Sequence, residues 1–224
     1  MMISVRGVGW LTKAGYGCVA TGREYRFEEG EGINALAKQG LFLHPFKNFG
    51  RLDLSSRMTT CAVALALRDA GISYSPLEKQ DIGIMGASSE GSLASDMAYF
   101  NDYLHNGRTL SRGNLFIYTL PSSPLGEAAI HFGLTGPLLF ATGGANAFGA
   151  SMSMAAEMLT GGEARMMLVG WLAPDGALYA VLCQEQAAGS LCSLEQAQFI
   201  VASAGGVAEQ ARRFSILQDT KGGT

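Results

Sequence analysis

The chain has 224 residues, a formal net charge of −3, 48% hydrophobic residues and 16% charged residues. This length and hydrophobic fraction predict a folded protein with a substantial core and exclude a disordered chain. The acidic balance and the scattered Lys and Arg residues argue against binding to nucleic acid, which requires a basic stripe. Few charges together with 30 glycines indicate little water-facing surface, and so favour a large interface with a partner.

No apolar run reaches the roughly 18 residues of a membrane span, and the N-terminal residues lack the basic and apolar regions of a signal peptide. We therefore expect a cytoplasmic protein without a membrane span. The four cysteines form no CxxC pair, and the three histidines lack metal-ligand spacing. Reduced thiols, no metal site and no cofactor are the expectation.

Strand and helix patterns alternate along the chain. In chain order they predict a strand at 3–10, a helix at 54–69, a strand at 82–86, helices at 92–104 and 123–132, a strand at 138–142, a helix from about Ala145 to Leu159, and strands at 166–169 and 178–183. This order predicts an α/β fold, a mixed and mostly parallel sheet with helices on both faces. In the helix at 92–104, Leu93, Met97, Phe100 and Leu104 share one face. From Gln184 onward the chain is polar and weakly patterned.

The junction between the strand at 138–142 and the following helix is the first candidate site. A helix N-terminus in such a place can hold a nucleophile or an anion, because its free N–H groups stabilise negative charge. Residues 141–146 read ATGGAN, however, with Thr142 as the only hydroxyl and no cysteine, serine or histidine. A tight turn that allows close helix packing is the simpler interpretation.

A second candidate follows the strand at 82–86, where residues 83–92 read GIMGASSEGS. This segment lacks the lysine of a phosphate loop and the GxSxG spacing of a hydrolase turn. A serine hydrolase using Ser88 or Ser89, with His131 and an aspartate, is an alternative that the sequence leaves open.

Several motifs together resemble the N-terminal half of a β-ketoacyl synthase, a member of the thiolase-like superfamily. They are VRGVGWLT at 5–12, RLDLS at 51–55, ALRDAGI at 66–72, LPSSPLG at 120–126 and FGLTGP at 132–137. The resemblance covers residues 1 to about 185 and implies a thiolase-like half-domain there, followed by a polar C-terminal tail at 186–224. A complete synthase would be roughly twice as long.

The resemblance also bears on catalysis. The family carries its catalytic cysteine at the strand-to-helix turn, whereas this chain has no cysteine between Cys61 and Cys183. The histidines or asparagine that decarboxylate the extender unit belong to the missing second half. The resemblance therefore implies a catalytically silent chain in a fatty-acid or polyketide-type pathway, acting as a partner subunit or acyl-chain holder.

Residues around the turn acquire roles from the same comparison. The expected acyl-pocket residues are Thr142, Gly143, Gly144, Asn146 and Phe148. A lone half-domain would leave an apolar helix face open, and the residues expected at that interface are Ala147, Ala150, Ser151, Met152 and Ala155.

The implied partner is a second copy or another ketosynthase-like chain, giving a homodimer or a heterodimer; rearranged local structure is the third way to cover the face. An acyl carrier protein is a further partner that the resemblance allows. One alternative is an acyltransferase that is active only when a partner chain supplies catalytic residues, with Cys61 or Cys183 as the acceptor.

Overall fold

One mixed β-sheet organises the computed structural model, which describes residues 2–108, 112–144, 146–184, 189–203 and 205–222. Within these residues the strand order is β3-β2-β1-β7-β6-β4-β5, and β8 pairs with β1. The strands are β1 (Ile3–Thr12), β2 (Gly15–Cys18), β3 (Arg23–Arg26), β4 (Ile82–Ser88), β5 (Leu138–Thr142), β6 (Met166–Ala173), β7 (Gly176–Gln184) and β8 (Cys192–Ser193). The helices are α1 (Ile33–Leu36), α2 (Leu54–Asp69), α3 (Leu93–His105), α4 (Gly113–Phe116), α5 (Ser123–Phe132), α6 (Ala147–Gly161), α7 (Leu194–Ser203) and α8 (Val207–Gly222), with 3-10 turns η1 (Phe49–Arg51) and η2 (Ile117–Thr119).

The strand pairings confirm a mixed sheet but correct the expectation that it is mostly parallel. The parallel pairs among the described strands are β4–β5 and β4–β6. The pairs β1–β2, β1–β7, β1–β8, β2–β3 and β6–β7 are antiparallel. The physical reason is the turn at Pro174 and Asp175, which joins β6 to β7 directly; so short a connection can only make a hairpin.

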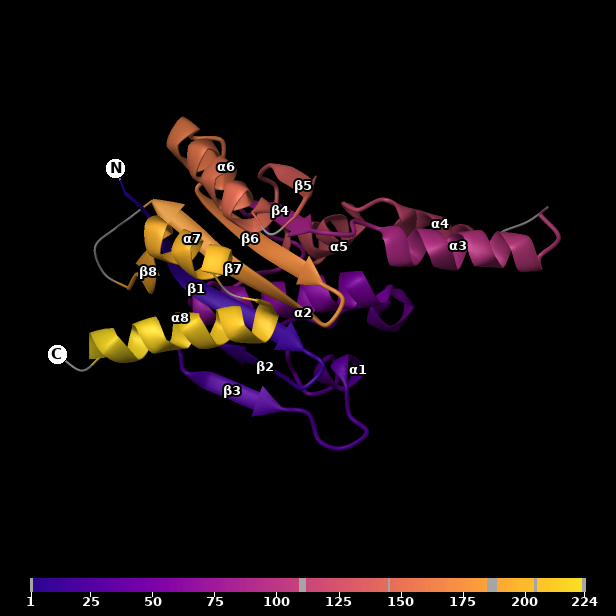
Figure 1. Ribbon diagram of the computed structural model, residues 1–224, viewed down its shortest axis with the longest axis horizontal. Coiled ribbons are helices and arrows are strands. Elements are labelled where there is room, and N and C mark those ends of the chain that lie inside the picture. Colours follow the sequence, from indigo (N-terminus) through magenta and orange to yellow (C-terminus); the bar gives the residue numbers. More distant parts are fainter. Residues whose placement is uncertain (1, 109–111, 145, 185–188, 204, 223–224) are drawn as a thin grey trace.

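Helices cover both faces of the sheet (Figure 1), as expected for this fold class. On one face α2 packs against β1 and β7, and α5 packs against α2. On the other face α6 covers β4 and β6, while α8 covers β1 and β7. Each face has its own apolar core, and the sheet lies between the two.

Helix α2 lies directly on β1 because β1 carries glycines at the contact. A Cβ atom at Gly7 or Gly9 would collide with the backbone of Ala70 or Ala66. At the end of α2, the buried Asp69 carboxylate accepts hydrogen bonds from the backbone of β1 and of the segment after β2. The glycines of β1 and residues 69–71 at the end of α2 therefore pack directly against each other.

The described part of the segment after residue 185 folds as β8, α7 and α8. Its apolar side chains join the core under α6; they include Ile200, Val207 and Phe214, all buried. The sequence predicts a polar tail here, because the apolar residues of this segment are interspersed among many polar ones. Helix α7 packs against α6, the helix whose apolar face a lone half-domain was expected to leave open, so local structure provides part of the cover.

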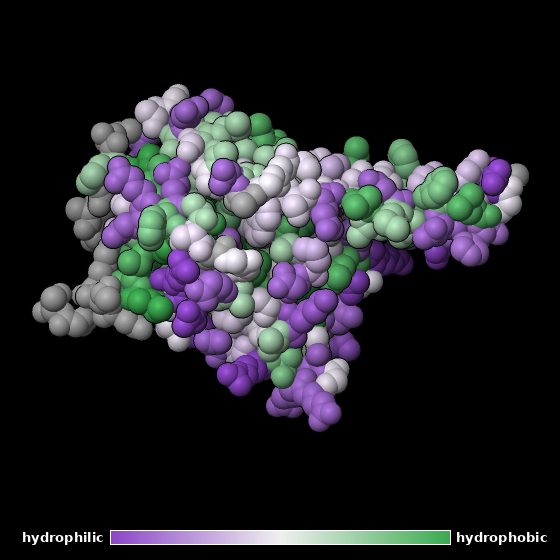
Figure 2. Space-filling model, viewed as in Figure 1, coloured by the Kyte–Doolittle hydropathy of each residue, from purple (hydrophilic) through white to green (hydrophobic). Residues whose placement is uncertain are grey.

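An arm made of α3, α4 and η2 extends away from the body (Figure 1). No residue of α3 is buried. Its surface is rich in apolar side chains, visible as green atoms in Figure 2. The large exposed ones on and beside the arm are Leu93, Met97, Phe100, Leu104, Phe116, Ile117 and Leu120.

None of the helices among the described residues combines the length and apolar character that crossing a membrane requires. In the same residues, no three His, Cys, Asp or Glu side chains gather in the way that metal ligands do.

Candidate functional site

The strand-to-helix turn predicted from the sequence lies between β5 and α6. The N–H of Gly143 donates to the Ser88 carbonyl at 3.0 Å, which continues the β4–β5 pairing past the end of β5. The N–H of Ala147 then donates to the Gly144 carbonyl at 2.9 Å and starts the helix. A Cβ atom at Gly143 would lie 3.2 Å from the Ala147 side chain, so the tight turn favours glycine there. Residue 145, where the helix was expected to begin, lies outside the described residues.

A cavity of about 470 Å³ opens beside this turn. Of the predicted pocket residues, Thr142, Gly143, Gly144 and Asn146 line it. Much of its wall is apolar, formed by Met85, Ala141, Ala147, Ala150 and Met154. The two methionines were not predicted as site residues, because a methionine on a strand or helix has no pattern that separates a cavity wall from a core.

Phe148 does not line the cavity, which corrects the prediction for this residue. It is buried in the core under α6, with its ring stacked 6.3 Å from that of Trp171. Phe148 is the second residue of α6, and its side chain lies on the face of the helix that packs against the sheet.

The predicted interface residues of α6 are divided between two faces. Ser151, Met152 and Ala155 are buried within the single chain, and Ser151 also lines the cavity. Ala147 is half-buried and Ala150 is exposed, and both line the cavity. Met152 and Ala155 belong to the face of α6 that packs on the sheet, whereas α7 contacts α6 at Gly149 and Ser153.

No thiol lies at the turn. Cys61 is buried in the middle of α2, where burial raises the pKa of its thiol far above the ordinary value. Cys18 is buried at the end of β2, and burial raises the pKa of its thiol to about 11. Cys183 is half-buried on β7 and belongs to a different cavity. A nucleophilic thiolate needs the opposite environment, with exposure and nearby positive charge.

The residues of the alternative serine hydrolase are not assembled. Ser88 is buried, and its Oγ accepts a hydrogen bond from the Gly91 N–H at 2.7 Å. Ser88 and Ser89 line one cavity, whereas His131 lines another. The His131 ring stacks on Phe46 at 4.0 Å, and burial lowers its pKa to about 4. A histidine with so low a pKa is a poor general base at neutral pH.

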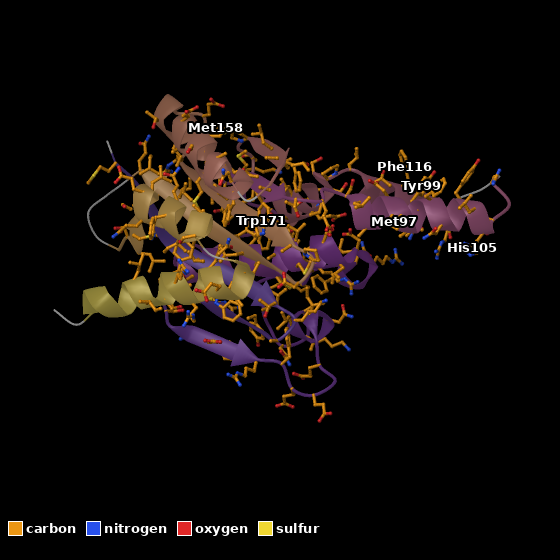
Figure 3. The ribbon with its side chains drawn as sticks, viewed as in Figure 1. Met97, Tyr99, His105, Phe116, Met158 and Trp171 are labelled. Carbon is orange, nitrogen blue, oxygen red and sulfur yellow. The ribbon has the colours of Figure 1, made fainter. Side chains whose placement is uncertain are left out.

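The arm is the second feature with functional character. Figure 3 shows Met97, Tyr99 and Phe116 on the arm, far from Trp171 and Met158 in the body. The rings of Tyr99 and Phe116 contact each other at 5.5 Å and hold α3 against α4. The apolar face of α3 points outward, with Met97 58% and Phe100 57% exposed. The sequence predicts this amphipathic face, but not that it lies outside the chain's own core.

Solved structures with a similar fold include ketosynthases and chain length factors. The ishigamide ketosynthase/chain length factor superimposes with a TM-score of 0.61 at 16% identity, covering 85% of this chain and 64% of that one. The AntDE:AntF complex, a type II PKS acyl-carrier protein with its ketosynthase, gives a TM-score of 0.55 at 14% identity over 82% and 58%. Ketosynthase ApeO in complex with its chain length factor ApeC, from Xenorhabdus doucetiae, gives 0.54 at 13% over 84% and 81%. These likenesses show the fold.

This chain spans about 64% and 58% of the length of the first two of these matched chains. No curated protein matches it significantly. The family model described as Beta-ketoacyl synthase, N-terminal domain, matches residues 29–206. That match includes the strand-to-helix turn, the arm and the sheet from β4 to β8, and the chain therefore belongs to the β-ketoacyl synthase N-terminal domain family.

Proposed function

We propose that this chain is a catalytically silent ketosynthase-like subunit that pairs with a ketosynthase-like chain in fatty-acid or polyketide-type biosynthesis. The observation that carries the proposal is the turn between β5 and α6. The turn has the geometry that would present a nucleophile at a helix N-terminus, yet its residues offer no thiol. A subunit of this kind contributes shape and contacts, while the partner performs the acyl transfer.

The arm supports the pairing. A helix without a single buried residue gains little stability from its own chain, and its exposed apolar face is unfavourable in water. A partner that covers Met97, Phe100 and their neighbours removes this cost. Chain length factors in two of the similar structures are named together with a ketosynthase, which makes a ketosynthase-like chain the partner that we propose.

The cavity at the turn supports the role of acyl-chain holder. Its wall of Met85, Ala147, Ala150 and Met154 suits an alkyl or polyketide chain, because burial of apolar surface against apolar surface is favourable. An acyl carrier protein that delivers such a chain is part of the same proposal, and one of the similar structures is named as a ketosynthase with its carrier protein.

Acyl loading tests directly whether the chain lacks acyltransferase activity. The chain is incubated with acyl-CoA and acyl-carrier-protein thioesters of several lengths, alone and with a co-expressed ketosynthase-like partner, and its intact mass is measured. We expect no change in mass. The variant Gly144→Cys serves as the positive control, because a side chain at this position meets nothing within 4 Å and would bring a thiol to the turn.

We expect Gly144→Cys to gain one acyl group under the same conditions. A stable acyl group on the unmodified chain, mapped by peptide sequencing to Cys61, Cys183, Ser88 or any other residue, would contradict the proposal and favour the acyltransferase.

A further inference from the structure

The four exposed apolar side chains of α3 form a narrow row, which we call the seam. Leu93, Met97, Phe100 and Leu104 are spaced by four, three and four residues and are between 39% and 58% exposed. This spacing matches the a and d positions of a coiled coil. A helix that packs on the core of its own chain usually has a wider apolar stripe. The seam therefore suits a single helix from another chain.

Hydrogen bonds on the opposite side of α3 hold the helix in place and leave the seam free. The Ser95 hydroxyl donates to the Asp53 carboxylate at 2.9 Å and ties α3 to the start of α2. The Asp102 carboxylate accepts from the Arg112 guanidinium at 2.9 Å and ties α3 to the segment before α4. At 3.6 residues per turn, positions 95 and 102 lie about half a turn away from the seam. A docking helix thus meets a helix that is already formed, and no cost of nucleation remains.

The spacing of the seam is the same in either direction along α3, which makes the seam complementary to itself. When α3 of a second copy lies antiparallel, Leu93 faces Leu104 of the second copy and Met97 faces Phe100 of the second copy. A two-fold axis between the helices repeats both contacts, as in an isologous interface. Each large apolar side chain then meets another one, and the four layers are filled along the whole seam.

The residues beside the seam are compatible with this arrangement. They are Ala94, Asp96, Asn101 and Tyr103, of which one is charged. In the antiparallel pair the flanking residue next to Asp96 is Tyr103 of the second copy, so no two like charges meet there. The arm projects from one side of the body (Figure 1). An antiparallel pair keeps the two bodies at opposite ends of the paired arms, whereas a parallel pair would bring both bodies to the same end.

From this seam we propose that, without another partner, α3 of one chain pairs with the antiparallel α3 of a second copy. Four side chains from each helix make a small contact, and interfaces below about 1,200 Å² are usually weak. The pair should therefore dissociate on dilution, which leaves the arm available to the ketosynthase-like chain. That exchange rests on the proposed function, whereas the pairing of two copies does not.

Disulfide formation between cysteine variants tests the pairing and its direction. Leu93→Cys and Leu104→Cys chains are mixed and oxidised, and the products are separated on a non-reducing gel. We expect a cross-linked dimer in the mixture, because the antiparallel pair places these two residues face to face. Each variant alone should give none. Identical residues of the two chains would then lie roughly 16 Å apart along the helix axis, whereas a disulfide needs Cα atoms within about 7 Å.

A mixture of Ala98→Cys with Leu104→Cys is the matched control. Ala98 is exposed on α3 but lies outside the seam, so this mixture should not cross-link.

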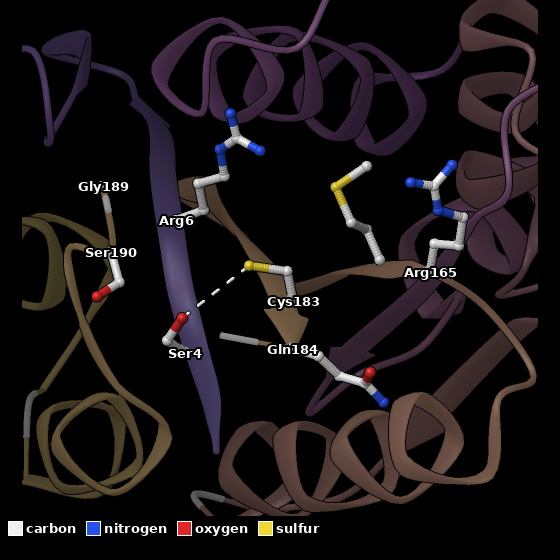
Figure 4. A pocket seen from close by; sticks show the side chains of 8 residues that line it. Ser4, Arg6, Arg165, Cys183, Gln184, Gly189 and Ser190 are labelled. Carbon is white, nitrogen blue, oxygen red and sulfur yellow. Dashed lines mark hydrogen bonds between the residues drawn. The ribbon is translucent and has the colours of Figure 1, made fainter. Parts of the chain in front are cut away.

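The native thiols set the background of the experiment. Cys183 is half-buried in a cavity beside Ser4 (Figure 4), and the other three cysteines are buried. The unmodified chain, oxidised in the same way, should therefore give no cross-linked dimer. Sedimentation of the unmodified chain provides a measurement that needs no variant, and we expect a monomer–dimer equilibrium that shifts toward the dimer as the concentration rises.

Four results would overturn the proposal. Cross-linking of each variant with itself would indicate a parallel pair, and equal cross-linking of the Ala98→Cys mixture would show that the seam does not form the contact. A dimer that gives no cross-link in the Leu93→Cys and Leu104→Cys mixture would place the interface elsewhere. A chain that sediments as a monomer at every concentration would exclude self-pairing. All of these experiments use this chain alone, so their results are independent of whether a ketosynthase-like partner exists.

Discussion

At the scale of single residues, the carboxylate of Asp69 gathers backbone groups from two parts of the chain. It accepts hydrogen bonds from the N–H groups of Val8 at 2.8 Å, Ala20 at 2.8 Å and Thr21 at 2.9 Å. Asp69→Asn removes the charge and replaces one accepting oxygen by an NH2 group, which cannot accept a hydrogen bond from these N–H groups. We expect the free energy of unfolding to fall by about 2–4 kcal/mol, measured by urea denaturation. Asp81→Asn, at an exposed position, is the control and should change it little.

His131 gives a prediction on pH. Burial, and then the charge of His44, lower its pKa from 6.5 to about 4. Below pH 6.5 the unfolded chain takes up a proton that the folded chain does not, so stability falls as the pH decreases toward 4 and then levels off. We expect this group to contribute a loss of about 2–3 kcal/mol across that window.

The contribution of His131 is isolated by repeating urea denaturation from pH 7 to pH 4 with His131→Phe, whose ring can keep the stack on Phe46. The variant should have a flatter pH dependence than the unmodified chain. Parallel curves for the two proteins would show that His131 is protonated normally in the folded state.

At the scale of elements, we expect substitutions on the arm to weaken association with a partner without changing the stability of the chain. Because α3 has no buried residue, the double variant Met97→Glu with Phe100→Glu should unfold at nearly the same urea concentration as the unmodified chain. Its association, with itself or with a co-expressed ketosynthase-like chain, should be lost in analytical ultracentrifugation. Ala98→Glu, a charged change at an exposed position of α3 outside its apolar face, should leave association intact.

Unchanged association of the double variant would place the partner contact elsewhere. Loss of folding in the double variant would mean that the apolar face of α3 packs within the single chain.

Individual helices show which features of the fold can be predicted from the sequence and which cannot. The bounds of α2 are predicted from its helical spacing and from the glycine that follows it, but its N-cap is Asp53, which accepts a hydrogen bond from the Ser56 N–H, and not one of the serines at 55 and 56. The turn before α6 is located correctly from its glycines. Periodicity identifies one apolar face on α3 and another on α6 but does not say what covers each face. It therefore cannot show that α3 is exposed, or that Phe148 and Met152 belong to the chain's own core.

At the scale of the whole molecule, α7 and α8 close one side of the sheet. Phe214 of α8 is fully buried there, whereas Phe199 of α7 is 73% exposed. We expect Phe214→Ala to lower the free energy of unfolding by about 3–5 kcal/mol, and Phe199→Ala to change it by less than about 0.5 kcal/mol. Equal effects of the two variants in urea denaturation would mean that α8 does not pack on the sheet.

The position of β7 has a consequence for synthesis of the chain. The sheet consists of one group of strands, β1 to β3, and another group, β4 to β6, which are joined by β7 alone. Ile3 pairs with Gln184, so a ribosome working at about 5–20 residues per second needs roughly 10–35 seconds between these two residues. Throughout that interval β1 lacks its β7 neighbour and presents an unpaired edge that can recruit strands of other nascent chains. Expression yield should therefore depend on protection of the nascent chain until Gln184 has emerged.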